Sequence, residues 1–216
     1  MSAVVALDGL LASRRLWRGQ PATHASPDAI ATGWAPLDAV LPGGGWPRAA
    51  LSEILLPADG VGELRLVWPA LARLGQGDGG VIAIVAPPYR PYAPAWHAAG
   101  LHPEALQVIE AAPRDALWAA EQCLRSGACS AVLCWPQKAD DRALRRLQVA
   151  AETGRTPGFA FRDAHAALNP SPAPLRIAIE TAPHRLRVLK CRGALVPPAP
   201  MPFPSAPAPF PAIAHG

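Results

Sequence analysis

The chain has 216 residues, half of them hydrophobic, with a formal net charge of +4. This length accommodates one domain with a full core, and the mildly basic balance permits contact with nucleic acid without proving it. No apolar run reaches the roughly 20 residues that cross a bilayer, and the first apolar segment precedes its arginines, the reverse of a secretory signal. We therefore expect a cytoplasmic protein without membrane contact.

The first thirty residues predict a helix followed by a linker. Residues 3–18 place apolar side chains at helical spacing, and residues 19–31 are rich in Pro, Ser and Ala. The helix is either a docking arm for a partner or a segment folded back on its own core. We divide the chain into this segment (1–30), a core (31–193) and a proline-rich tail (194–216) that is expected to be disordered alone.

A strand flanked by two glycine-rich turns organises the core. Residues 42–45 predict a turn, 50–56 a strand, 57–62 a second loop and 63–74 a helix, which is the order of parts in a P-loop nucleotide site. The spacing of that loop survives, and its positions are Pro57, Gly60, Gly62, Glu63 and Leu64. Its chemistry does not survive, because Pro57 has no amide hydrogen and Leu64 has no hydroxyl for Mg²⁺. Glu63 puts an anion where the loop needs a cation, and two like charges about 4 Å apart cost roughly 4 kcal/mol at a surface-like dielectric. We expect a degenerate loop that binds no ATP.

The remaining core alternates apolar strands with amphipathic helices. Its continuously apolar runs indicate parallel strands covered on both faces, and its last two strands alternate as an antiparallel hairpin with one wet face. Asp140 or Asp141 is expected to cap one helix, whereas Pro69 is expected to bend another or delay its start. The predicted fold is α/β, with helices on both faces of a mostly parallel sheet; the segments are helices at 94–100, 114–126 and 141–153 and strands at 81–86, 106–110, 130–135, 158–161, 175–181 and 185–191.

Two groups of basic residues are candidates for contact with DNA or an acidic partner. The first lies on the outer face of the helix at 141–153, where a solvated helix face is the alternative; the second makes the C-terminal hairpin basic. The candidates are Arg142, Arg145, Arg146, Arg187, Lys190 and Arg192.

The loop at 87–96 and the tail carry aromatic side chains with two possible roles. Tyr89, Arg90, Tyr92 and Trp96 either stack on bases or a partner, or seal the sheet edge within a proline-stiffened loop. The tail is either a short docking segment, with Phe210 among its anchors, or a solubilising extension.

No known catalytic or metal-binding motif is apparent. The four cysteines lack CxxC and zinc-finger spacing, which favours buried small hydrophobes in a reducing compartment. The chain contains neither G-x-S-x-G nor H-E-x-x-H. We therefore expect no metal, no cofactor and no enzymatic activity.

Several long motifs resemble one bacterial family. They are TGWAPLDAVLPGGGWPRAALSEILLP, GVGELRLVWPALARL, APPYRPYAP, ALWAAEQCLRSGACSAVLCWP, LRRLQVAAE and KCRG. In this order they are similar to ImuA, the RecA-like accessory protein of translesion DNA synthesis, often grouped with SulA; the similarity spans residues 17–193.

The resemblance implies a RecA-like fold and a place in the mutagenesis complex of the SOS response to DNA damage. The implied role is a non-catalytic adaptor whose partners are an ImuB-type inactive Y-family polymerase homologue and an error-prone replicative-type DNA polymerase, with DNA contacted directly or through them. It also implies that Pro88 replaces the glutamate that activates water, and that Trp135 or Cys134 replaces the metal-holding aspartate.

Three other functions stay open at this point. A SulA-like inhibitor of the division protein FtsZ would share the fold and the missing lysine. An active ATPase would need a replacement cation such as Arg65. A stand-alone DNA-binding module would rest on the basic helix and hairpin.

Overall fold

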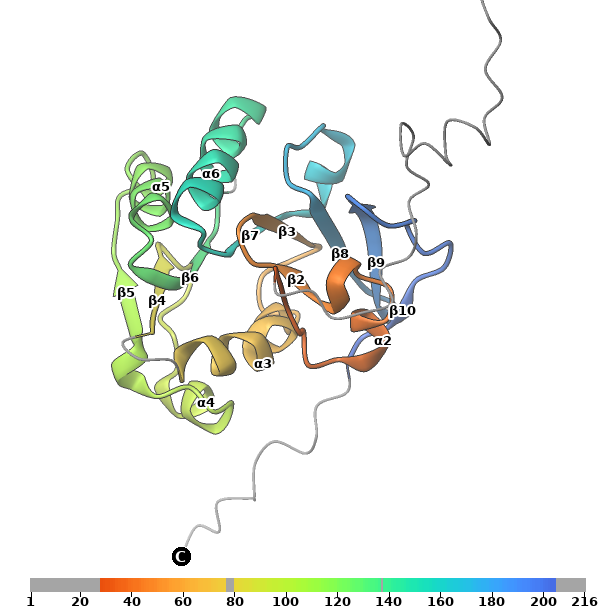
Figure 1. Ribbon diagram of the computed structural model, residues 1–216, viewed down its shortest axis with the longest axis horizontal. Helices are drawn as coiled ribbons and strands as arrows, with labels where there is room; N and C mark the ends of the chain where they lie inside the picture. Colours follow the sequence, from red (N-terminus) through yellow and green to blue (C-terminus); the bar gives the residue numbers. More distant parts are fainter. Residues whose placement is uncertain (1–27, 77–79, 137, 205–216) are drawn as a thin grey trace, which may run out of the picture.

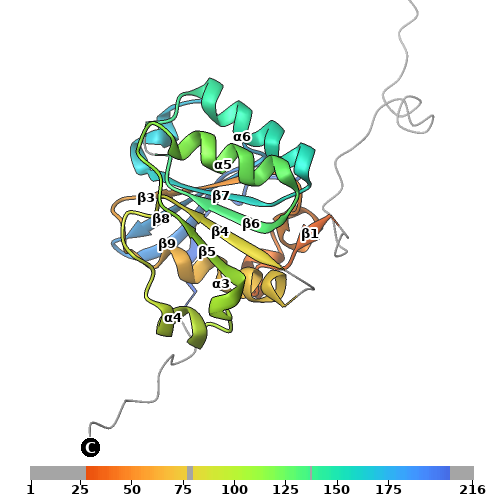
Figure 2. The same ribbon diagram turned by 90° about the vertical axis from the view of Figure 1, so that its left-hand side faces the viewer.

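The computed structural model describes residues 28–76, 80–136 and 138–204. One mixed sheet forms the centre of the molecule, with α5 (Ala116–Ser126) and α6 (Asp141–Gly154) on one face. Helices α3 (Glu63–Gly75) and α4 (Ala93–Ala98) cover the other face (Figures 1 and 2). The predicted N-terminal helix lies outside the described residues.

The main sheet has eight strands in the order β10-β9-β8-β3-β7-β6-β4-β5. The six strands from β8 to β5 are parallel, whereas β9 pairs antiparallel with β8 and β10 pairs antiparallel with β9. This arrangement confirms the predicted α/β class, the mostly parallel sheet and the C-terminal hairpin. The strands are β3 (Leu51–Leu56), β4 (Val81–Val85), β5 (Leu106–Ile109), β6 (Cys129–Cys134), β7 (Gly158–Asp163), β8 (Leu175–Thr181), β9 (His184–Cys191) and β10 (Met201–Pro202).

Short elements complete the described chain. A two-stranded ladder precedes the main sheet, a helical turn follows the first strand of that ladder, and three 3-10 turns occupy loops. They are β1 (Ala29–Ile30), α2 (Ala35–Asp38), η1 (Pro42–Gly44), β2 (Trp46–Pro47), η2 (Pro103–Ala105) and η3 (Ala164–Leu168).

Two hydrophobic clusters hold the layers together. Ile54 and Leu56 of β3 face the cluster that α3 and α4 cover, whereas Leu51 faces the cluster beneath α5 and α6. Every residue of β3 is buried, as the period-two geometry of a doubly covered strand requires. The loop that follows β3 therefore starts from the rigid middle of the molecule.

Local signals account for the helix boundaries. The Oδ1 atom of Asp140 accepts a hydrogen bond from the Ala143 amide at 2.7 Å and caps α6. Gly127 ends α5 in the left-handed conformation. Helix α3 starts at Glu63, as the predicted range 63–74 has it, and continues through Pro69; of the two alternatives for Pro69, the later start is not observed.

The predicted disordered tail begins later than the sequence indicated. Met201 pairs with Leu186, and the Phe203 ring is buried and stacks on His184 with ring centroids 3.9 Å apart. Met201 and Phe203 therefore lie on the core, because a strand edge and an apolar surface accept them, whereas Leu195 is 93% exposed; residues 205–216 lie outside the described residues.

Within the described segments, no helix is both long and apolar enough to cross a membrane.

The cysteines differ from the expectation in part: Cys134 and Cys191 are buried, whereas Cys123 and Cys129 are only half-buried.

Candidate functional site

The loop between β3 and α3 has the shape of an anion-binding turn. Gly60 and Gly62 have φ angles of +81° and +96°, a region that glycine enters without steric cost. Helix α3 begins at the next residue, Glu63, so the positive end of its dipole points into the loop. This is the geometry with which a helix N-terminus holds a phosphate.

The side chain of Glu63 occupies this turn. Its Oε1 atom accepts a hydrogen bond from the Gly60 amide at 3.2 Å, and the residue is 5% exposed. Its Oε2 atom is buried without a hydrogen-bond partner among the described residues. An internal carboxylate therefore lies beside the amide and the helix end that would otherwise hold a bound anion.

The other positions of this loop offer no group that would bind a phosphate or Mg²⁺. Leu64 packs against the larger hydrophobic cluster, and Pro57 is exposed and has no amide hydrogen to donate. Outside the loop, a carbon of the Phe203 ring lies 3.5 Å from where a Cβ atom on Gly62 would be. The Phe203–His184 stack thus flanks the loop on its outer side.

The two strand ends that the resemblance singled out carry no acid. Pro88, which follows β4, is exposed. Trp135, which follows β6, stacks on Phe161 with ring centroids 4.9 Å apart, and burial raises the pKa of the neighbouring Cys134 thiol to about 12. Neither a proline nor an indole accepts a proton from water or ligates Mg²⁺.

A cleft of about 1180 Å³ opens beside these strand ends. It lies at the carboxyl edge of β4, β5 and β6, where ligands of open α/β sheets commonly bind. Its lining is mainly apolar and rich in proline, with four charged side chains; the lining residues include Asp59, Pro87, Pro88, Arg90, Pro91, Val108, Glu110, Leu117, Trp135 and Lys138.

The arginines of α6 are largely paired with acids. Arg145 Nη2 lies 3.0 Å from the Asp141 carboxylate, and Arg146 Nε lies 3.1 Å from the carboxylate of Glu121 on α5. Arg142 is exposed and forms no ion pair with the residues described. This arrangement favours the solvated-face alternative, because two of the three cations are already neutralised.

The basic residues of the hairpin have local partners as well. Arg187 Nε lies 2.6 Å from the Glu180 carboxylate, and Lys190 donates to the Ser171 carbonyl at 2.7 Å. Desolvation, followed by the charges of Arg192 and Arg176, lowers the pKa of Lys190. Arg192 itself is exposed. Within the described chain, no hydrogen bond or ion pair joins these residues to the arginines of α6. The basic residues of the hairpin and those of α6 therefore do not form one connected group.

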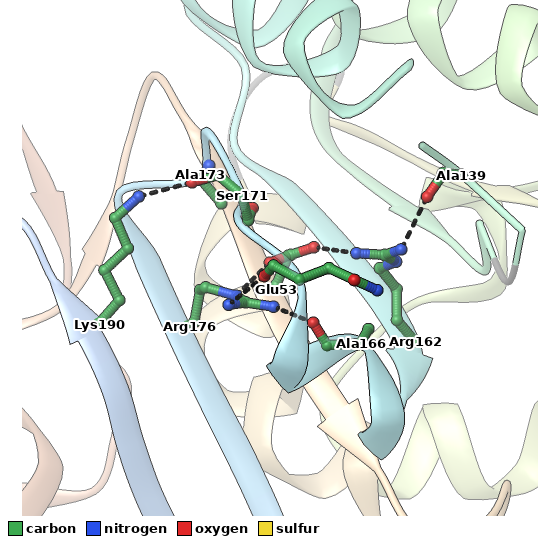
Figure 3. A network of polar contacts seen from close by, with 9 residues as sticks. Glu53, Ala139, Arg162, Ala166, Ser171, Ala173, Arg176 and Lys190 are labelled. Atoms are coloured by element: carbon green, nitrogen blue, oxygen red, sulfur yellow. Dashed lines mark hydrogen bonds and ion pairs between the residues drawn. The ribbon is translucent and has the colours of Figure 1, made fainter. Parts of the chain in front are cut away.

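Sequence reasoning missed a buried ionic cluster in the middle of the sheet (Figure 3). Glu53 of β3 is fully buried, and its two carboxylate oxygens meet Arg162 Nη1 of β7 at 2.7 Å and Arg176 Nε of β8 at 2.6 Å. The arginines are 4% and 6% exposed. The sequence signal was a charged residue with apolar residues on both sides in two strands, LSEILL and LRIAIET, and an arginine directly after an apolar run in the third, GFAFRD.

The cluster also holds two loops against the sheet. Arg162 donates to the Ala139 carbonyl at 2.8 Å, and Arg176 donates to the Ala166 carbonyl at 2.7 Å. Buried charges are tolerated only when they are paired and hydrogen-bonded. Its role is therefore structural: it connects three strands with the segments that follow β6 and β7.

Metal ligands do not gather in the described residues: no group of three or more His, Cys, Asp or Glu side chains could hold an ion there.

Comparisons with known proteins give a partial likeness among solved structures. No protein-family model matches the chain, and no curated protein matches it. Among solved structures, the chain is similar to SulA from Pseudomonas aeruginosa, at 27% sequence identity and a TM-score of 0.45. The match covers 53% of this chain and 98% of the SulA chain.

Proposed function

We propose that this chain is a non-catalytic adaptor of RecA-like fold that acts in the cytoplasm within a damage-induced translesion DNA synthesis complex. Its proposed partners are an ImuB-type inactive Y-family polymerase homologue and an error-prone replicative-type DNA polymerase. The partner assignment rests on the family resemblance of the sequence motifs.

The main support for the absence of catalysis in this proposal is the Glu63 carboxylate in the turn before α3. Gly60 donates to it at 3.2 Å, so the amide that would receive a phosphate is already engaged. Pro88 and Trp135 add to this support, because neither offers a base or a metal ligand. Arg65 is exposed on α3, and an arginine there would have to displace Glu63 before any anion could enter.

The surface that best suits a protein partner lies on the loop between β4 and α4. Tyr89 and Tyr92 are 70% and 69% exposed, and buried tyrosines are among the residues that contribute most to interface affinity. The α6 arginines are a weaker choice, since ion pairs occupy Arg145 and Arg146. We therefore assign the adaptor contact to the Tyr89 and Tyr92 loop, and any contact with DNA to exposed Arg142 and Arg192.

Calorimetric titration tests the adaptor role directly. The full chain is titrated with the ImuB-type protein from the same operon, with FtsZ as the comparison. Binding to the ImuB-type protein and not to FtsZ is expected. Binding to FtsZ alone would replace the adaptor role with the SulA-like alternative.

Paired variants test the proposed surface. Tyr89→Ala with Tyr92→Ala should weaken binding at least tenfold, since truncating each interface tyrosine costs about 1 kcal/mol or more. Leu168→Ala is the control, because Leu168 is 86% exposed on η3, which follows β7, whereas the tyrosine loop follows β4, a strand that β7 does not neighbour. Equal affinity for both variants would move the contact elsewhere on the chain.

A further inference from the structure

The cleft at the carboxyl edge of β4, β5 and β6 has no net charge. Two acids, Asp59 and Glu110, are balanced by two bases, Arg90 and Lys138, and the remaining lining is mainly apolar. A polyanion such as a nucleic-acid strand gains nothing from a surface whose charges cancel. The lining therefore suits an uncharged, apolar occupant.

The described chain leaves the sheet on the edge where this cleft opens. Strand β10 is antiparallel to β9, which is antiparallel to β8, which is parallel to β3. The residue after β10, Phe203, therefore lies at the carboxyl edge of the parallel strands. Its ring flanks Gly62, and Asp59 of the same loop lines the cleft.

The segment that follows has the matching composition. Residues 205–216, SAPAPFPAIAHG, contain no Asp, Glu, Lys or Arg, and their large apolar side chains are Phe210 and Ile213. Proline-rich sequences in general favour extended conformations, which lowers the entropy lost on docking. A segment without Asp, Glu, Lys or Arg side chains also brings no such side-chain charge against either pair of charges in the cleft.

Its length is sufficient. Strands β6 and β4 are the fifth and sixth neighbours from β10, which corresponds to about 24–29 Å at the usual spacing of strands. Phe210 is seven residues beyond Phe203 and reaches about 23–25 Å in an extended chain, while Ile213, ten residues beyond, reaches about 33–36 Å. In a fully extended chain, Phe210 thus reaches the β6 side of the cleft and Ile213 reaches β4 while Phe203 stays in place.

We propose that residues 205–216 dock in the cleft of their own chain, with Phe210 and Ile213 as apolar anchors. The docked segment covers Val108 on the edge strand and the prolines that follow β4. This contact does not require the adaptor role, although Pro88, Arg90 and Pro91 of the lining neighbour Tyr89 and Tyr92 in the proposed partner loop.

A labelled peptide with the sequence SAPAPFPAIAHG tests the proposal by fluorescence anisotropy. It is titrated with the full chain and with a full-length variant carrying Phe210→Ser and Ile213→Ser. The peptide should bind the variant about tenfold or more tightly than the unmodified chain, because a tethered segment competes at an effective concentration near the millimolar range. Ala206→Ser with Ala214→Ser is the matched tail control and should behave like the unmodified chain.

Two substitutions in the cleft locate the contact. Val108→Glu and Pro88→Glu, each added to the Phe210→Ser and Ile213→Ser variant, should weaken peptide binding tenfold or more. Val108 is 46% exposed and Pro88 is exposed, so circular dichroism should show an unchanged fold.

Three results would overturn the proposal. The first is no binding of peptide to the tail variant at millimolar concentration, and the second is equal binding to the tail variant and the unmodified chain. The third is binding that neither cleft substitution changes. The tail of the unmodified chain competes with the labelled peptide for the cleft. If this competition disappears when the unmodified protein is diluted, the competing tail belongs to a second copy, and docking within one chain is refuted.

Discussion

The Gly60 amide and the Glu63 carboxylate, joined by a hydrogen bond of 3.2 Å, close the turn that precedes α3. The carboxylate lies at the positive end of the helix dipole, where a negative charge is stabilised. A residue that reads as a repulsive charge in the sequence is thus an internal substitute for a bound anion.

Removing this carboxylate should open the turn to an anion. We expect Glu63→Ala to bind tripolyphosphate with a dissociation constant in the millimolar range, about −4 kcal/mol, because the Gly60 amide and the helix end lose their internal partner. The unmodified chain should bind none in an isothermal titration.

Glu104→Ala is the control for this measurement, since it removes one exposed acid and changes the net charge equally. If Glu104→Ala gains the same affinity, general electrostatics and not the turn accounts for the binding.

The buried cluster around Glu53 should dominate the electrostatic contribution to stability. Glu53→Ala leaves two guanidinium groups buried without their shared counter-ion and should lower the free energy of unfolding by about 3–5 kcal/mol. Urea denaturation followed by circular dichroism measures the change. Glu180→Ala, which removes the partly exposed partner of Arg187, should cost less than about 1 kcal/mol; similar losses for the two variants would contradict the assignment.

The crossing of α5 and α6 depends on a glycine. A Cβ atom added at Gly154 would lie 1.9 Å from the Leu124 carbonyl oxygen and 2.9 Å from the Gly127 nitrogen. Both are backbone atoms, so Gly154→Ala should cost about 3 kcal/mol in unfolding free energy because the helices must separate.

Gly60→Ala provides the comparison. It has a positive φ of +81° but no atom within 4 Å of the added Cβ, so only backbone strain of about 1–2 kcal/mol is expected. A loss at Gly154 no larger than the loss at Gly60 would show that the helices accommodate the methyl group.

Cys123 should be the most reactive of the four thiols at neutral pH. A hydrogen bond from the Cys129 thiol lowers the pKa of Cys123 to about 7, whereas the pKa of Cys129 is raised and burial raises that of Cys191 to about 11. The thiolate is the reactive form. The rate of Cys123 alkylation should therefore rise steeply around pH 7 and be about fiftyfold lower at pH 5 than at pH 7.

Mass spectrometry after brief treatment with iodoacetamide measures this dependence. Cys129→Ala removes the hydrogen bond and should shift the pH of half-maximal reactivity of Cys123 upward, toward 9. An identical pH profile in both proteins would show that Cys129 does not influence Cys123.

Local patterns in the sequence determined the elements and the fold class. The apolar run at 81–86 and the alternating segments at 175–181 and 185–191 became strands, because burial on two faces or one dictates those patterns. The spacing from Pro57 to Leu64 likewise located the loop and the start of α3.

Long-range contacts decided the rest. Glu53 pairs with Arg162 and Arg176, which are 109 and 123 residues away in the sequence. Glu121 of α5 pairs with Arg146 of α6. Local sequence patterns therefore predict neither the buried cluster nor the neutralised charge on α6. The docking of Met201 and Phe203 on the core likewise required a strand edge and an apolar surface. The spacing of apolar residues shows which face of a segment is buried. Which residue pairs with a buried charge, and which strand pairs with a sheet edge, depends on the segments that the tertiary structure brings together.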